Sequence, residues 1–141
     1  MSSKLSVGIH MLTVLALHRG EALASRCIAM SVNTNPVVIR RLLGLFREAG
    51  LVESKTGVGG GWELVADPKR ITLLDVLRVV EPKNEAFALH RSEPNPKCPV
   101  GCNIQDVLVD IYGDVEQAMA ERLARSTIAS VIDALEGRGR A

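Results

Sequence analysis

Residues 33–62 contain a sequence of turn signals that fixes the order of local structures in this part of the chain. Asn35 followed by Pro36 starts a helix, because asparagine caps helix N-termini and proline suits the first helical position. Apolar spacing predicts a helix over residues 37–49, which Gly50 ends. The buried side of this helix should hold Val38, Leu42, Leu45 and Phe46 or their neighbours. Short strands follow at 51–55 and 62–65, joined by a glycine-rich turn at 56–61.

A second short helix is predicted just before this segment. Ser25 is expected to cap it, and the helix should run to Val32, with Asn33 and Thr34 forming the turn to the next helix. Two helices joined by a short turn form a helix-turn-helix, and a hairpin directly after them makes a winged helix. An ordinary helical hairpin within a core is the alternative for the two helices alone. A nucleotide-binding loop does not fit the glycines, because no Lys-Ser/Thr follows and the next residues form a strand.

The first helix is expected over residues 5–17, where apolar residues recur at helical spacing. The same stretch loosely imitates a secretory signal, but His10 interrupts it and charged residues crowd the supposed cleavage region. We therefore expect a core helix and a cytoplasmic protein. No apolar run approaches the roughly 18 residues that span a bilayer.

The C-terminal half predicts a linker followed by a long helix. Thr72 and Asp75 form a capping box for a helix over 73–80, and a proline-rich linker occupies 82–102. Asn103 should cap the longest helix, to about residue 123, and Ser126 a last helix through Leu135. The predicted fold is mainly α with a small β-hairpin wing. We expect a DNA-binding domain at 1–81, a linker or sensor loop at 82–102 and dimerisation helices at 103–136.

The long helix carries an apolar stripe over about five turns, which a domain of this size cannot easily bury alone. Its cover is either the chain's own first helix or a second copy of the chain, and the favoured hypothesis combines both, with the first and long helices of two subunits forming a shared core. A homodimer would also match a two-fold symmetric operator.

The start of the helix at 37–49 supplies the candidate contacts to double-stranded DNA. Side chains that could reach base edges are Asn35, Val37, Arg40 and Arg41. The alternative for the two arginines is a solvated helix face. Candidates for phosphate or minor-groove contact are Ser25, Thr34, Lys55, Gly59, Gly60 and Trp62.

The runs 33–42, 47–52 and 57–62, together with 71–76 and the long helix from Asn103, closely resemble the IscR/CymR/NsrR family of winged-helix regulators. The resemblance covers residues 3–136. It implies a homodimer with swapped or crossed long helices, a promoter-binding repressor or activator, and an effector sensed in the linker. Cluster-binding members carry three linker cysteines plus a further ligand. This chain has only Cys98 and Cys102 there, with His90 upstream, so the iron–sulfur function does not carry over.

Three interpretations of the linker cysteines remain open. Cys98 and Cys102 are structural thiols, a redox-responsive thiol pair, or ligands of a metal or iron–sulfur cluster together with His90 or residues from elsewhere. No cofactor is assigned from sequence. Cys27 lies between helical apolar residues and should be a buried small hydrophobe. An odd cysteine count fits a reducing compartment better than a disulfide scaffold.

Charge and motifs together favour a regulator over other classes. Residues 1–80 carry ten Lys/Arg against six Asp/Glu, whereas residues 81–141 carry seven against ten, which suits a DNA-facing first half. No metalloprotease, Walker or nucleophile-elbow motif is present, so no enzyme is predicted. The predicted function is a DNA-binding regulator, with repression the favoured sense. A winged helix that only binds other proteins is the alternative.

Overall fold

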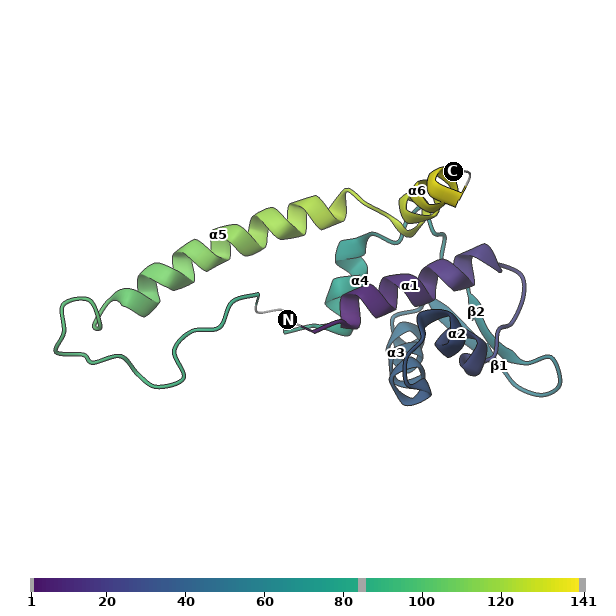
Figure 1. Ribbon diagram of the computed structural model, residues 1–141, viewed down its shortest axis with the longest axis horizontal. Coiled ribbons are helices and arrows are strands. Elements are labelled where there is room, and N and C mark those ends of the chain that lie inside the picture. Colours follow the sequence, from purple (N-terminus) through teal and green to yellow (C-terminus); the bar gives the residue numbers. More distant parts are fainter. Residues whose placement is uncertain (1, 84–85, 140–141) are drawn as a thin grey trace.

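The computed structural model describes residues 2–83 and 86–139, so Met1, the linker residues 84–85 and the tail residues 140–141 lie outside the description. Figure 1 shows the elements in chain order. In the described residues they are α1 (Lys4–Leu17), α2 (Ser25–Val32), α3 (Pro36–Glu48), β1 (Val52–Lys55), β2 (Gly61–Leu64), α4 (Leu73–Val80), α5 (Ile104–Ala124) and α6 (Ile128–Gly139). The predicted mainly α fold with a small antiparallel hairpin is confirmed.

The hydrophobic core lies where α1 meets α2, α4 and the hairpin, with α3 packed beneath it (Figure 1). It consists of aliphatic residues with one aromatic side chain, Phe46, which is fully buried. The remaining core residues are Met11, Leu12, Leu15, Ile28, Ala29, Ile39, Leu42, Leu43, Val52, Leu64, Ile71, Val76, Val80 and Ile128. The prediction that 5–17 forms a core helix is therefore confirmed.

The buried side of α3 differs by one position from the expected one. Leu42 and Phe46 are buried as predicted, but Ile39 and Leu43 complete the buried set, while Val38 and Leu45 lie only partly covered. Residues one position apart are about 100° apart on a helix, so the rotation of the helix about its axis decides whether Ile39 or Val38 is buried. The sequence pattern, with apolar residues at both positions, did not determine that rotation.

Two predicted helix caps are present. The Asn35 side chain accepts a hydrogen bond from the Val37 backbone N–H at 2.9 Å, with Pro36 at the first helical position. Thr72 and Asp75 form the predicted capping box, each side chain accepting the other residue's backbone N–H at 3.0 Å. These local signals place the starts of α3 and α4.

Two other predicted caps are wrong, and a third has the predicted position without the capping bond. Ala24, and not Ser25, is the N-cap of α2, and its side chain makes no capping hydrogen bond. Asn103 is the N-cap of α5 as predicted, but its side chain accepts no capping hydrogen bond, and its amide N–H donates to the Cys102 sulfur. For α6 the reciprocal bonds are made by Thr127 and Ser130 rather than by Ser126, and the helix continues past Leu135 to Gly139.

The last helix returns to the N-terminal body. α6 packs against α1, and Ile128 at its start is fully buried. A β-bridge joins Thr72 to Thr127, and the Ile128 N–H donates to the Ile71 carbonyl at 3.0 Å. Both ends of the chain that the structure describes are therefore attached to one body (Figure 1).

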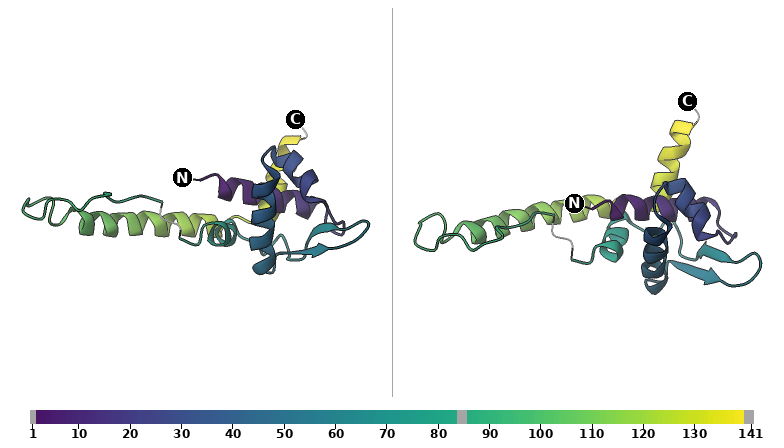
Figure 2. Two further views of the ribbon diagram at one scale, coloured as in Figure 1. Left: turned by 90° about the horizontal axis from the view of Figure 1, so that it is seen from below. Right: turned by 60° about the horizontal axis from the view of Figure 1, so that its bottom comes forward.

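The long helix α5 extends away from that body, as the additional views show (Figure 2). It contacts α4 near its C-terminal end rather than packing along α1, and none of its residues is fully buried. The hypothesis that its stripe is covered by the chain's own first helix is therefore wrong. None of the helices in residues 2–83 and 86–139 is long and apolar enough to cross a bilayer.

Gly8 allows α1 to approach its neighbours closely. A Cβ at this position would lie 3.1 Å from the Phe46 ring, 3.2 Å from Val76 and 3.3 Å from Val80. Protein cores are packed so densely that added methyl groups displace their neighbours. Gly8 is thus the point at which α1 settles on α3 and α4.

We predict that Gly8→Val lowers the free energy of unfolding by about 2 kcal/mol, because valine must displace the Phe46 ring and two valines. Gly44→Val, the same change on α3 where an added Cβ meets nothing within 4 Å, should change it by less than about 0.5 kcal/mol. Urea unfolding followed by circular dichroism measures both. Equal effects of the two substitutions would contradict close packing at Gly8.

Candidate nucleic-acid interface

The N-terminal half of α3 presents polar and cationic side chains to solvent. Asn35, Val37, Arg40 and Arg41 are all exposed, and Val37 is 49% exposed. The opposite side of the helix is fixed in the core by Ile39 and the other buried residues, so the exposed side has a fixed direction. In the described residues neither arginine takes part in a salt bridge. The two guanidinium groups are therefore available to an anionic partner.

The turn before α3 is held in one conformation. Asn33 ends α2 in the left-handed region with φ 61°, a conformation that asparagine adopts more readily than most residues. The N–H groups of Asn33 and Thr34 both donate to the Ala29 carbonyl, at 2.8 and 3.3 Å. Thr34 is half-buried in the turn and Ser25 is half-buried at the start of α2. α2 and α3 thus form a helix-turn-helix with a rigid joint.

The hairpin carries Lys55 at the end of β1 and glycines at its tip. Lys55 forms an ion pair with Glu63 on β2, with 2.6 Å between Nζ and Oε2. This hydrogen bond, and the negative charge of Glu63, raise the pKa of Lys55 above its usual value. Lys55 is therefore cationic but already partnered, unlike the arginines of α3. Gly59 is exposed at the tip, and a Cβ on Gly60 would overlap the Lys55 carbonyl.

Trp62 joins the hairpin to the chain before α2. Its backbone exchanges two hydrogen bonds with Leu23, at 2.8 and 2.7 Å, which form an isolated antiparallel bridge. Its ring is partly buried, and the Arg47 guanidinium lies over it at 5.5 Å from the ring centroid. A DNA phosphate cannot use the backbone N–H of Trp62, because the Leu23 carbonyl already accepts its hydrogen bond. The predicted contact by Trp62 is thereby limited to its ring.

Two cations at this surface were missed by the sequence analysis. Arg26 is exposed in the first turn of α2, and Arg47 is held by Trp62. Arg26 follows Ser25 directly, so a phosphate bound at the start of α2 would also lie near its guanidinium group. The position of Arg47 depends on the fold bringing α3 against β2, and no local pattern indicates that contact.

Cys27 is exposed on α2, and the prediction that it is buried is wrong. In the eight-residue α2 only Ile28 and Ala29 are buried, so a single turn faces the core and Cys27 lies outside it. Apolar neighbours in sequence did not reveal which side of so short a helix is covered.

The two linker cysteines lie at opposite ends of one turn before α5. The Cys102 N–H donates to the Cys98 carbonyl at 3.0 Å, and the Cys102 thiol donates to the Pro99 carbonyl at 3.4 Å. Backbone N–H groups of Gly101 and Val100 that hydrogen-bond to the Cys98 sulfur hold its pKa below the ordinary value. All three cysteines are free thiols. The arrangement favours the thiolate at Cys98.

The third proposed metal ligand, His90, is exposed in the linker. In residues 2–83 and 86–139, no three His, Cys, Asp or Glu side chains lie close enough together to hold a metal ion. The Cys98 sulfur accepts two backbone N–H groups, and the Cys102 sulfur lies within hydrogen-bond distance of the Pro99 carbonyl and the Asn103 amide. With two linker cysteines and no third such side chain beside them, the described residues of one chain do not supply the four ligands of an iron–sulfur cluster.

A helix-turn-helix with a following β-hairpin defines a winged-helix DNA-binding protein, and the exposed start of its second helix bears two arginines without an ion pair in the described part of the chain. Residues 1–134 match the family model Rrf2, described as an iron-dependent transcriptional regulator. The chain belongs to the Rrf2 family of transcriptional regulators.

Relatives of known name agree with this assignment. YwnA of Bacillus subtilis is 42% identical over 135 residues, covering 96% of this chain and 98% of YwnA. CymR of the same organism is 32% identical over 113 residues, covering 79% of this chain and 81% of CymR. Both names describe HTH-type transcriptional regulators. A crystal structure of a Lactobacillus plantarum protein superposes with a TM-score of 0.84 at 26% identity, covering 99% of this chain and 93% of that one.

The comparisons confirm the family resemblance and the predicted class of function. The chain is a DNA-binding transcriptional regulator, not an enzyme, because the family and the named relatives are regulators. DNA is its partner, which favours the regulator hypothesis over the protein-binding adaptor. The individual residues that touch DNA stay predictions.

Proposed function

We propose that the protein is a cytoplasmic homodimer that represses transcription by binding a pseudo-palindromic operator. Residues 1–81 would bind DNA, 82–102 would respond to a signal, and 103–136 would hold the dimer. The observation that carries the proposal is the exposed start of α3, with Arg40 and Arg41 free of ion pairs in the described residues. A dimer bound over a promoter would exclude the polymerase from it.

Within each half-site we assign different roles to the α3 and hairpin cations. Arg40, Arg41, Asn35 and Val37 would face base edges in the major groove, where arginine donates two hydrogen bonds to guanine. Ser25, Thr34 and Arg26 would contact phosphates, as would Gly59 and Gly60 through the hairpin backbone. Lys55 would contribute mainly charge, because Glu63 restrains its ammonium group. Trp62 would support the surface through its ring.

We predict that Arg40→Ala or Arg41→Ala weakens binding to the specific operator by about 1–3 kcal/mol while changing affinity for scrambled DNA little. Lys55→Ala should weaken both duplexes alike and reduce the salt dependence of binding, because it removes only a charge near phosphate. The operator would come from selection of bound genomic fragments, and fluorescence anisotropy would give the affinities.

Arg138→Ala is the matched control, since it removes an exposed arginine from α6. It should leave both affinities unchanged. If neither α3 arginine affects operator affinity while the control behaves as expected, the recognition-helix assignment is wrong.

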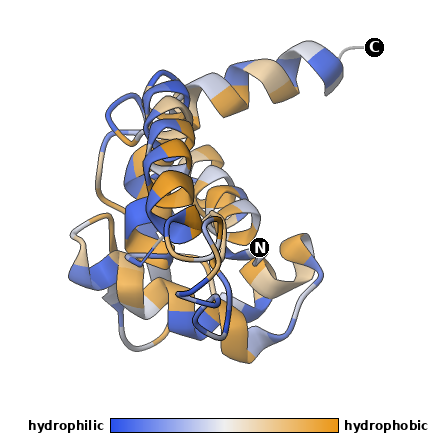
Figure 3. Ribbon diagram, turned by 90° about the vertical axis from the view of Figure 1, so that its left-hand side faces the viewer, coloured by the Kyte–Doolittle hydropathy of each residue, from blue (hydrophilic) through white to orange (hydrophobic). Residues whose placement is uncertain are grey.

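The homodimer is proposed from the uncovered side of α5. Val107, Ile111 and Val115 are spaced four residues apart and therefore lie on one side of the helix. Val107 and Ile111 are each 50% exposed, and Val115 is 37% exposed. Figure 3, which looks at the protein from the free end of α5, shows apolar segments along this helix. Fully burying an exposed aliphatic side chain is worth about 1.5–3 kcal/mol, and roughly half of that remains to be gained at each of these half-exposed residues, so a second α5 is a favourable partner for this side.

We predict that Ile111→Lys combined with Val115→Lys produces monomers or insoluble protein, because charges would be buried without partners between two α5 helices. Gln117→Lys places the same charge on another side of α5, beside Glu121, and should preserve the dimer. Analytical ultracentrifugation measures the oligomeric state of all three proteins. A soluble, stable dimer of the double variant would rule out this interface.

The signal in the linker is proposed to be an oxidant acting on Cys98 and Cys102. The Cys98 thiolate would attack peroxide, breaking the O–O bond to give a sulfenic acid and hydroxide. The Cys102 thiol would then displace the sulfenic oxygen as water, its proton completing that water, to form a disulfide. The geometry supports the second step, because the turn between the two cysteines is already closed by the Cys102 N–H.

We predict that peroxide lowers operator affinity of the wild-type protein with loss of two thiols per chain, and that Cys98→Ser or Cys102→Ser abolishes the response. Cys27→Ser, which removes the exposed thiol of α2, should retain it. Because the pKa of Cys98 is lowered, its thiolate persists to lower pH than that of an ordinary cysteine, and the reaction should slow only as pH falls through that lowered pKa.

Thiol titration and anisotropy on anaerobically purified protein measure these outcomes. An unchanged response in both linker variants would show that the cysteines are structural. Stoichiometric iron in the purified protein, with a brown colour, would overturn the thiol mechanism.

A further inference from the structure

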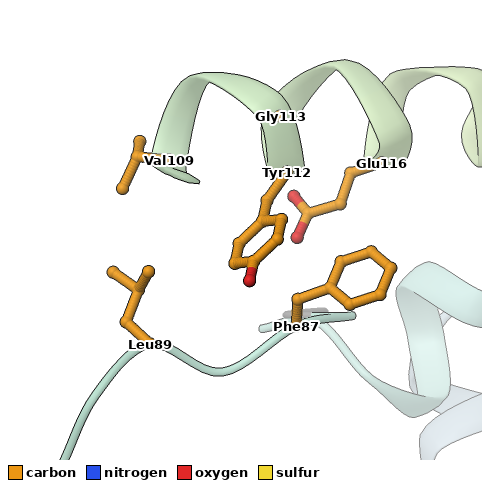
Figure 4. A pocket seen from close by; sticks show the side chains of 6 residues that line it. All are labelled: Phe87, Leu89, Val109, Tyr112, Gly113 and Glu116. Atoms are coloured by element: carbon orange, nitrogen blue, oxygen red, sulfur yellow. The ribbon is translucent and has the colours of Figure 1, made fainter. Parts of the chain in front are cut away.

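A small cavity lies where the linker folds back on the middle of α5. Its volume is about 330 Å³, and its walls are formed by linker residues and by one side of the helix (Figure 4). The lining residues are Phe87, Leu89, Val109, Tyr112, Gly113 and Glu116. Neither the DNA contacts nor the proposed thiol pair use any of them.

Two of the chain's four aromatic residues meet at this cavity. The Phe87 and Tyr112 rings are stacked, with centroids 5.0 Å apart and an angle of 29° between their planes. Phe87 follows shortly after α4, so the stack attaches the beginning of the linker to α5. Aromatic faces carry negative charge density and attract cations. The cavity therefore has an apolar wall that also suits a positively charged group.

Glu116 supplies a carboxylate to the same cavity. Figure 4 shows its oxygens beside the Tyr112 ring and on the side of the cavity that Phe87 closes. One oxygen accepts the Ala86 N–H at 3.3 Å, and no cation pairs with Glu116 in the described part of the chain. A carboxylate has about four acceptor positions, so most of its capacity remains unused. The side chain is also half-buried, which strengthens its attraction for a cation.

Gly113 leaves the helix side of the cavity open. A Cβ at this position would meet nothing within 4 Å, so packing does not require glycine. Glycine in a helix interior costs about 1 kcal/mol relative to alanine, and a simple anchoring contact for the linker would favour a side chain that fills the space. The combination of an open floor, an aromatic stack and a carboxylate with spare acceptor positions is that of a binding site.

We propose that this linker–α5 cavity binds a small organic amine with an aromatic or aliphatic body. The ammonium group would donate to Glu116 and lie against the Tyr112 ring, while the apolar body would fill the space between Leu89, Val109 and Gly113. The bound molecule would contact both the linker and α5, and so would add to the attachment that the Phe87–Tyr112 stack already provides. The site is distinct from the Cys98–Cys102 turn, which precedes α5.

The test uses 2-phenylethylamine and two probes of similar shape, the neutral 2-phenylethanol and the anionic 3-phenylpropionate. The chain has a single tyrosine, so 3-fluorotyrosine incorporation gives one ¹⁹F signal, from position 112 in the cavity. We expect the amine to shift this signal saturably at millimolar concentration. The alcohol should bind about tenfold more weakly, because it lacks the charge-assisted hydrogen bond to Glu116, and the carboxylate should not bind.

Variants locate the site on the full-length protein. Glu116→Gln should weaken binding of the amine about tenfold, whereas Glu121→Gln, the same change on α5 outside the cavity, should leave it unchanged. Gly113→Leu should abolish binding by filling the cavity while keeping α5 helical, which circular dichroism verifies.

Three results would overturn the proposal. They are the absence of saturable binding by the amine, equal binding of amine and alcohol, and undiminished binding to the Gly113→Leu protein. The measurement contains no DNA and no oxidant, so its outcome is independent of the operator and thiol proposals.

Discussion

Two backbone hydrogen bonds between Leu23 and Trp62 fix the relation of the hairpin to the helix-turn-helix. Leu23 precedes α2 and Trp62 lies in β2, so the bridge joins the entrance of the helix-turn-helix to the return strand of the hairpin. Gly61, with φ 147°, makes room for it, because a Cβ there would press on the Leu23 carbonyl. The stack of Arg47 on Trp62 adds a contact from α3 to the same strand. Three elements of the interface thus share one residue of the hairpin.

This constraint explains which local signals could be interpreted from sequence. Asn35 and Thr72 begin helices whose start depends on the residues beside them, and both caps were predicted. The start of α2 was misplaced at Ser25 because the Leu23–Trp62 bridge, formed with a strand 39 residues later, holds Ala24 extended. The hairpin was predictable, because a glycine-rich stretch between two short strands is typical of a tight turn.

Burial was harder to predict than secondary structure. Cys27 was placed in the core because its neighbours are apolar, yet an eight-residue helix covers too few turns for periodicity to define its buried side. The apolar stripe of α5 was predicted from its spacing. Sequence alone could not show that α5 extends away from the body, so that its own chain leaves the stripe uncovered. The residues that touch DNA are harder still to predict, because the orientation of α3 in a groove depends on the duplex as well as on the fold.

Because α6 returns to pack on α1, the helix α5 is held by the body at one end only. Its C-terminal end is clamped between α4 and the buried start of α6, while its other end carries the cysteine turn. Twenty-one residues of helix place those ends about 30 Å apart. A helix is stiff over this length, so a small tilt at the clamped end becomes a displacement of several ångströms at the free end. In the proposed homodimer, a shift of the cysteine turn would therefore change the angle between the two α3 helices through α5 itself.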